Sequence, residues 1–153
     1  MAHALNLTLP IKQDPETLER LQYIKAAFAR ELQPRIDSIL RESGIIHFAK
    51  FFIIHDKYIV LSAEYDGNPK EYTDFFRVSL PDVFKSLFSL VEGAPPFDDL
   101  DGQSFFELSQ SLDLPSLGES TEGSTDASSQ TKGYLFSAYG NRSVREILSR
   151  LRY

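Results

Sequence analysis

The chain lacks several residue types and patterns, and each absence removes a class of function. Its 153 residues include no cysteine, which excludes disulfide scaffolds, thiolate metal sites and a cysteine nucleophile. Basic residues are fewer than acidic ones, 16 against 22, and the formal charge of −6 disfavours nucleic acid and anionic membrane surfaces as partners. No apolar run approaches the roughly 18 residues that are needed to cross a bilayer, so no membrane span is predicted.

The N-terminal residues do not form a basic region followed by an apolar one, so no signal peptide is predicted and a cytoplasmic protein is expected. The length favours a single domain over residues 1–153 that can bury a sizeable core. Residues 115–131 are mainly Ser, Thr, Gly, Glu and Asp and include no aromatic residue. Such a segment cannot offset an ordering cost of about 1–2 kcal/mol per residue. We therefore predict a flexible insertion, acidic and rich in Ser and Thr, at about 93–131.

Apolar periodicity predicts strands separated by helices. Residues 4–11 alternate between apolar and polar, which is typical of a half-buried strand. Asp14 and Pro15 form a helix start, and the helical stripe that follows continues past an interruption at Pro34. The remaining elements are expected to be a hairpin over 45–67, a helix from 68 that bends or restarts near 81, a short helix over 104–111, a strand over 133–140 and a terminal helix from 143.

The hairpin over 45–67 consists of two β-branched and aromatic runs around a short polar turn. A two-residue turn at Asp56 and Lys57 would pair His47 with Asp66 and place Glu64 on the same face as His47. A three-residue turn would shift the second strand by one residue and exchange its faces.

The order β-α-β-β-α-loop-β-α is that of the split βαβ, or ferredoxin-like, arrangement. This is an α+β fold, and we expect a four-stranded antiparallel sheet with helices on one face. In either hairpin register the opposite face is substantially apolar, which solvent exposure disfavours. We therefore expect a homodimer in which the two sheets face each other.

Three segments carry a family resemblance: 47–51 (His-Phe-Ala-Lys-Phe), 64–67 (Glu-Tyr-Asp-Gly) and 72–76 (Tyr-Thr-Asp-Phe-Phe). With the order of elements, they resemble the dimeric α+β barrel proteins. The greatest similarity is to an uncharacterised branch with a His-Phe-Ala-Arg-Phe hairpin; Lys50 stands where that branch has arginine. The resemblance covers about 5–91 and resumes near 133. That superfamily includes cofactor-free monooxygenases, haem enzymes and proteins without known activity, so the resemblance implies a dimeric barrel rather than a reaction.

The candidate site is built around His47. A histidine oriented by a carboxylate can act as a base, so we predict His47 and Glu64 as catalytic residues. Phe51, Ser62 and Asp66 are predicted to bind ligand. The alternative interpretation is structural: His47 bonds to a neighbouring residue, and Asp66 only ends its strand at a turn.

No cofactor is expected. In the haem proteins of this superfamily the ligand lies on a helix after the sheet, and no predicted helix here contains histidine, so haem is not expected. No ligand spacing typical of a metal site is present. We predict a protein that binds a small apolar or aromatic molecule between the two sheets. The alternatives are a cofactor-independent oxygenase or isomerase that uses His47, and a protein-interaction module formed by the loop at 97–131.

Overall fold

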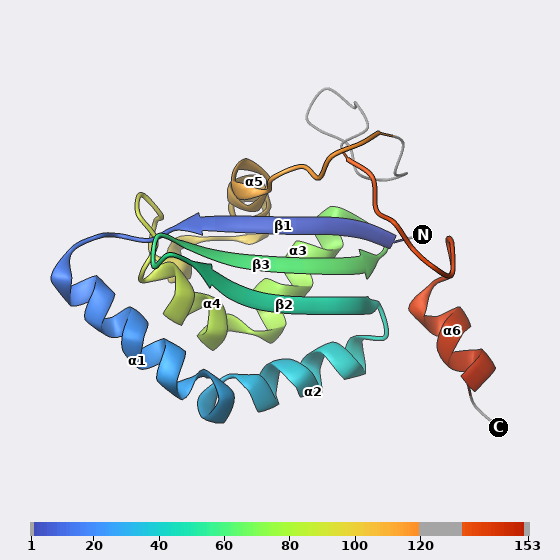
Figure 1. Ribbon diagram of the computed structural model, residues 1–153, viewed down its shortest axis with the longest axis horizontal. Coiled ribbons are helices and arrows are strands. Elements are labelled where there is room, and N and C mark those ends of the chain that lie inside the picture. Colours follow the sequence, from blue (N-terminus) through green and yellow to red (C-terminus); the bar gives the residue numbers. More distant parts are fainter. Residues whose placement is uncertain (1, 120–132, 152–153) are drawn as a thin grey trace.

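The centre of the molecule is a three-stranded antiparallel sheet (Figure 1). It is seen in a computed structural model that describes residues 2–119 and 133–151. The strands are β1 (Ala2–Pro10), β2 (Ile46–Ile54) and β3 (Tyr58–Asp66), in the order β1-β3-β2. The expected four-stranded sheet is therefore wrong. Residues 133–140, predicted as the fourth strand, form an irregular segment that ends in a turn.

The position beside β1 where a fourth strand would pair is occupied by the chain at Asp113 and Leu114. Leu114 donates its N–H to the carbonyl of Asn6 at 3.0 Å, and the Asn6 N–H donates to the Asp113 carboxylate at 2.8 Å. Leu7 and Asp113 form an isolated antiparallel bridge. These bonds use backbone groups at the outer edge of β1, so residues 133–140 do not complete the sheet there.

The helices follow the start and stop signals of the sequence. The Asp14 side chain accepts the N–H of Thr17, and the Asn68 side chain accepts those of Lys70 and Glu71. Each predicted interruption separates two helices, with a proline in the first turn of the second one. The helices are α1 (Pro15–Glu31), α2 (Gln33–Ser43), α3 (Pro69–Ser79), α4 (Pro81–Phe88), the 3-10 turn η1 (Phe97–Asp99), α5 (Gly102–Leu112) and α6 (Val144–Leu151).

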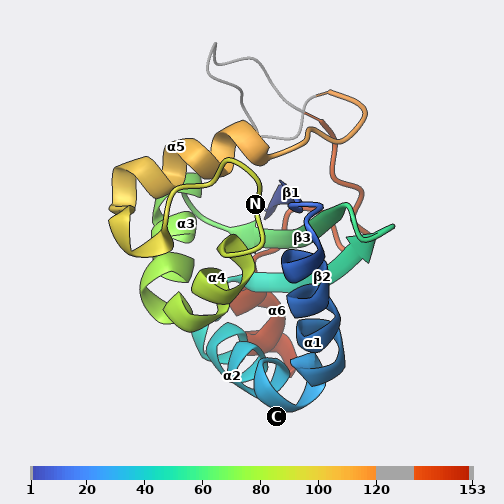
Figure 2. The same ribbon diagram turned by 90° about the vertical axis from the view of Figure 1, so that its left-hand side faces the viewer.

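The core lies between one face of the sheet and the helices, as the view in Figure 2 shows for α3 and α4. Alternate residues of β1 and β3 supply the sheet side of this core, and their apolar side chains are buried. The helix side is largely aromatic, with Phe84 at the centre of contacts to Phe76, Phe88, Phe97 and Phe105. Phe97 and Phe105 come from η1 and α5. These two elements lie within the predicted insertion at 93–131, of which residues 120–131 lie outside the described part of the chain.

The hairpin has the three-residue turn, so the two-residue turn at Asp56 and Lys57 is wrong. Ile54 pairs with Tyr58, and the Lys57 N–H donates to the Ile54 carbonyl at 2.8 Å. His55 and Asp56 have φ values of 49° and 56°. Helix α1 holds this turn, since the Asp56 carboxylate accepts bonds from Lys25 at 3.1 Å and from Gln22 at 3.2 Å. These contacts between distant segments are not visible in the hairpin sequence itself.

The face of the sheet opposite the core is called the open face below. It carries Phe48, Lys50, Phe52 and Ile54 from β2 and Ser62 and Glu64 from β3. Helix α6 lies beyond the end of the sheet, and none of its residues is buried. Among the described residues, no helix is long and apolar enough to cross a membrane.

Candidate functional site

A β-bulge in β2 sets the direction of His47. Ile46 pairs with Tyr65 and Phe48 pairs with Glu64, so His47 is the additional residue in its strand. Regular alternation would turn residue 47 to the same side as Ala49 and Phe51, toward the helices. The bulge instead directs its ring to Asp66 at the end of β3, where only 2% of the side chain is exposed.

Three side chains form a continuous hydrogen-bonded chain at this point. The Nε2 and Nδ1 atoms of His47 lie 2.7 Å from Asp66 Oδ1 and 2.7 Å from the Tyr139 hydroxyl, respectively. A carboxylate can only accept, so Nε2 carries the proton of the neutral imidazole and donates it to Asp66. Nδ1 then has a lone pair and accepts the hydroxyl proton of Tyr139. The two rings are also stacked, with centroids 5.6 Å apart and an interplanar angle of 18°.

Asp66 also holds the C-terminal helix. Its second oxygen, Oδ2, accepts the N–H of Val144 at 2.8 Å, and Val144 is the first residue of α6. The predicted terminal helix begins at a capping box: Ser143 N–H donates to Glu146 at 2.7 Å, and Glu146 N–H donates to the Ser143 hydroxyl at 3.1 Å. One carboxylate therefore bonds both to the histidine and to the helix.

A hollow of about 630 Å³ lies over the open face next to this chain of bonds. Residues 135–139 form one wall, and residues of the strands form the other. Its lining is apolar at Phe48 and Phe136, with polar groups from both strands and from residues 137 and 139. The lining residues are Ala2, His47, Phe48, Ala49, Lys50, Ser62, Glu64, Leu135, Phe136, Ser137, Ala138 and Tyr139.

Two acidic groups at the hollow, the Glu64 carboxyl and the Tyr139 phenol, have raised pKa values. Burial raises the pKa of Glu64 above its ordinary value, against the opposing effect of Lys50 and His47. Burial, and then the negative charges of Asp66 and Glu64, raise the pKa of Tyr139. Tyr139 is therefore a protonated phenol at neutral pH and can donate to His47. Lys50 lies over the Phe52 ring, with Nζ 5.7 Å from the ring centroid.

The structure brings together most of the residues predicted from the sequence. His47, Ser62 and Glu64 line the hollow, and Asp66 bonds to His47. Phe51 lies on the other face, where its ring centroid is 5.8 Å from that of Phe28. Tyr139 is not among the predicted site residues; it belongs to the aromatic segment 133–140, whose composition predicts a strand.

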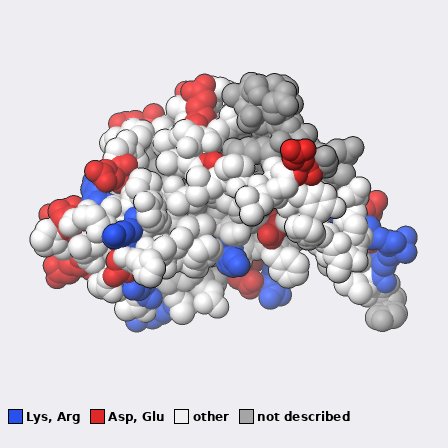
Figure 3. Space-filling model, turned by 45° about the horizontal axis from the view of Figure 1, so that its top comes forward, with Lys and Arg blue, Asp and Glu red and all other residues white. Residues whose placement is uncertain are grey.

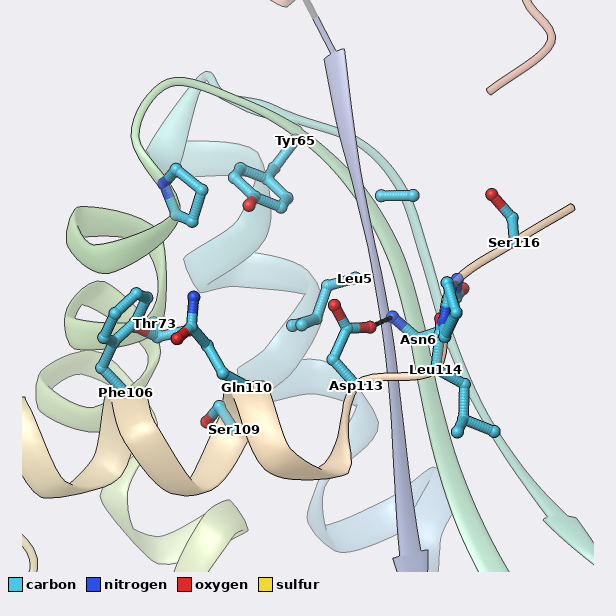
Figure 4. Close-up of a pocket in the computed structure, with 13 residues that line it drawn as sticks. Leu5, Asn6, Tyr65, Thr73, Phe106, Ser109, Gln110, Asp113, Leu114 and Ser116 are labelled. Atoms are coloured by element: carbon cyan, nitrogen blue, oxygen red, sulfur yellow. Dashed lines mark hydrogen bonds between the residues drawn. The ribbon is translucent and has the colours of Figure 1, made fainter. Parts of the chain in front are cut away.

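A second, smaller pocket of about 50 Å³ lies between β1 and α5 (Figure 4). The buried Ser109 hydroxyl lines it and has no hydrogen-bond partner among the described residues. The space is sufficient for water molecules but not for an organic ligand. Within residues 2–119 and 133–151, no group of three or more His, Asp and Glu side chains is placed to hold a metal ion. The hollow beside Tyr139 is therefore the better candidate for a ligand site.

Comparison of the chain with protein-family models, with curated proteins and with solved structures finds no match.

Proposed function

We propose that the protein binds a small apolar or aromatic molecule in the hollow beside His47 and Tyr139. The observation that carries the proposal is the hollow itself, because its volume of about 630 Å³ falls in the range of ligand pockets, roughly 300–1,000 Å³. Aromatic walls with a few polar groups are typical of such pockets, since the walls bind the body of a ligand and the polar groups orient it.

The two aromatic walls support this proposal by their exposure. Phe48 and Phe136 are 72% and 85% exposed, although each offers a large apolar surface. A ligand between them would remove apolar area from water at a gain of about 25 cal/mol per Å². Neither side chain has a comparable gain from the core, so their positions favour a binding role over a structural one.

The test is a screen of small aromatic compounds by thermal shift, followed by calorimetry of those that stabilise the protein. We expect at least one compound to bind, and Phe48→Ala and Phe136→Ala to weaken its binding at least about tenfold, a loss of about 1.4 kcal/mol. Val78→Ala is the matched control, because Val78 is 62% exposed on α3 and does not line the hollow. Equal binding by all three variants would contradict the proposal.

We also propose that the protein is a homodimer formed through the open face. Phe52, Ile54 and Tyr58 are exposed apolar residues that line one side of the sheet together with Phe48. Figure 3 shows a broad surface with few charged side chains between the two ends of the molecule. Two copies of such a face would shield each other from water.

Sedimentation of the wild type and of Phe52→Glu tests the dimer. We expect the wild type to sediment as a dimer and Phe52→Glu as a folded monomer, because a carboxylate in the interface would lack a partner. Val78→Glu is the control and should remain dimeric. A monomeric wild type at all concentrations would refute the dimer but not the ligand site.

A second candidate function is cofactor-independent acid–base catalysis, as in an isomerase or an oxygenase. The hydrogen-bonded chain of Asp66, His47 and Tyr139 favours it, because a histidine oriented by a carboxylate is a common general base. The expected role of Glu64 changes here: Asp66, and not Glu64, orients His47.

A further inference from the structure

We propose that the hollow takes phenolic or enolic ligands as their anions, with Tyr139 receiving the ligand's hydroxyl proton and passing its own proton to His47. This inference rests on the proposed ligand-binding function and names its ligand class. In this proposal Tyr139 contacts the ligand. His47 holds the transferred proton and remains hydrogen-bonded to Asp66.

The direction of the hydrogen bonds determines what Tyr139 can offer to a ligand. Its hydroxyl proton points to His47 Nδ1, because Asp66 already receives the proton on Nε2. The Ser137 side chain also bonds to the phenol, and one lone pair of the phenol oxygen remains to accept a proton from a bound hydroxyl group. An acidic hydroxyl, as in a phenol or an enol, is the group that this arrangement matches.

Exposure along the chain supports the same direction. The His47 side chain is almost fully buried, whereas Tyr139 is 38% exposed and lines the hollow. Both residues line the hollow, and Tyr139 is the one whose side chain is open to a ligand. His47 receives a proton without direct contact with the ligand.

The proton transfer balances without any other reactant. The ligand O–H bond breaks and a new O–H bond forms on Tyr139, while the original Tyr139 O–H bond breaks and an N–H bond forms on His47 Nδ1. The electron pair of the ligand O–H bond stays on the ligand oxygen. The products are a ligand anion and an imidazolium that is hydrogen-bonded to the Asp66 carboxylate, and nothing is oxidised or reduced.

The charges that face the hollow suit these products. Lys50 lines the hollow, and its positive charge can offset the negative charge of the ligand. Asp66 offsets the positive charge of the imidazolium at 2.7 Å. Glu64 is the opposing acidic group at the hollow. Phe48 and Phe136 provide apolar walls for an aromatic ring.

The experiment uses para-nitrophenol, whose neutral and anionic forms differ in visible absorption. At about one pH unit below the pKa of the compound, roughly a tenth of the free molecules are anionic. We expect more than about half of the bound molecules to be anionic in the wild type. Tyr139→Phe should leave bound para-nitrophenol mainly neutral, and nitrobenzene, which has no hydroxyl proton, reports whether this variant still binds an aromatic ring.

Proton release provides a second measurement on the wild type alone, so the test does not depend on the folding of Tyr139→Phe. If His47 stores the proton, binding of para-nitrophenol as its anion releases almost no proton to the buffer. If Lys50 alone selects the anion from solution, about nine-tenths of a proton is released per ligand under the same condition. Calorimetry in two buffers of different ionisation enthalpy distinguishes these results.

The outcomes separate this inference from the function on which it rests. Failure of both para-nitrophenol and nitrobenzene to bind would overturn the ligand site and this inference together. Binding of both, with para-nitrophenol mainly neutral or with a proton released to the buffer, would overturn the proton transfer alone. An anionic signal that persists unchanged in a folded Tyr139→Phe variant would also overturn the proton transfer alone.

Discussion

His47 and Asp66 are joined by a 2.7 Å hydrogen bond between residues in two adjacent strands, and a bulge at His47 makes this bond possible. The three-residue turn moves the partner of each β2 residue one position toward the start of β3, since Ile54 pairs with Tyr58, and the bulge moves it one further position in the same direction, since Ile46 pairs with Tyr65. His47 and Asp66 are therefore not paired across the strands, and they meet only because the bulge turns the His47 ring toward Asp66. The sequence-based expectation named the correct partner of His47 for the wrong reason.

The first prediction concerns the contribution of His47 to folding. His47→Ala removes a buried ring and two hydrogen bonds, and leaves Asp66 and Tyr139 without this partner. We expect the free energy of unfolding to fall by about 1–3 kcal/mol, measured by urea denaturation. Ser62→Ala is the control, since its hydrogen bond to Asn6 is long at 3.3 Å, and it should change stability by less than about 0.5 kcal/mol. A stability equal to that of the wild type would show that the chain of bonds is not formed.

The second prediction concerns the attachment of α6. Asp66→Asn retains the shape of the side chain but leaves one acceptor oxygen for two donors, the His47 ring and the Val144 N–H. We expect faster amide hydrogen exchange in α6 and a loss of about 1–2 kcal/mol in stability. Asp74→Asn, in the surface pair with Arg77, should leave the exchange of α6 unchanged. Equal exchange in both variants would contradict the anchoring role of Asp66.

The third prediction is a pH dependence that arises from Glu64. Burial raises its pKa in the folded protein above the ordinary value of 4.5, so the folded state binds this proton more tightly than the unfolded state. The contribution of Glu64 to the stability of the fold is therefore complete below pH 4.5, and it is lost as the pH rises through the raised pKa. Glu64→Gln should therefore raise the melting temperature at neutral pH relative to the wild type, and this difference should shrink as the pH falls toward 4.5. A difference that is constant across this range would exclude the proposed cause.

The fourth prediction tests the three-residue turn. His55 has a φ of 49°, which a β-branched residue adopts only with strain. We expect His55→Val to destabilise the protein by about 1–2 kcal/mol and His55→Asn to be neutral within about 0.5 kcal/mol in chemical denaturation. Tyr58→Val introduces the same residue in the adjacent strand and should lower the stability by less than His55→Val does. If His55→Val were neutral, the positive φ at this position would be refuted.

The elements that local signals specify could be predicted from the sequence. Asp14 and Asn68 cap helices through bonds to residues two or three positions away, so the pattern and its structural cause lie in the same segment. The alternation in β1 likewise follows from burial of one face. Such signals do not depend on how the rest of the chain folds.

The number of strands could not be predicted, because it depends on which distant segment reaches the edge of β1. Residues 133–140 have the aromatic content of a strand, but Asp113 and Leu114 bond to β1 instead. Phe136 and Tyr139 of the later segment line the hollow. Tyr139 could not be predicted as a partner of His47 for the same reason, because its aromatic side chain is equally typical of a strand.

The shared carboxylate of Asp66 has a thermodynamic consequence. Its two oxygens connect the His47 imidazole to the first peptide group of a helix that has no buried residue. Any shift of the carboxylate toward one of these partners changes the geometry of its bond to the other. Linkage then requires reciprocity: whatever fixes the position of α6 must restrict the orientation of the His47 ring, and whatever fixes the ring must restrict the helix.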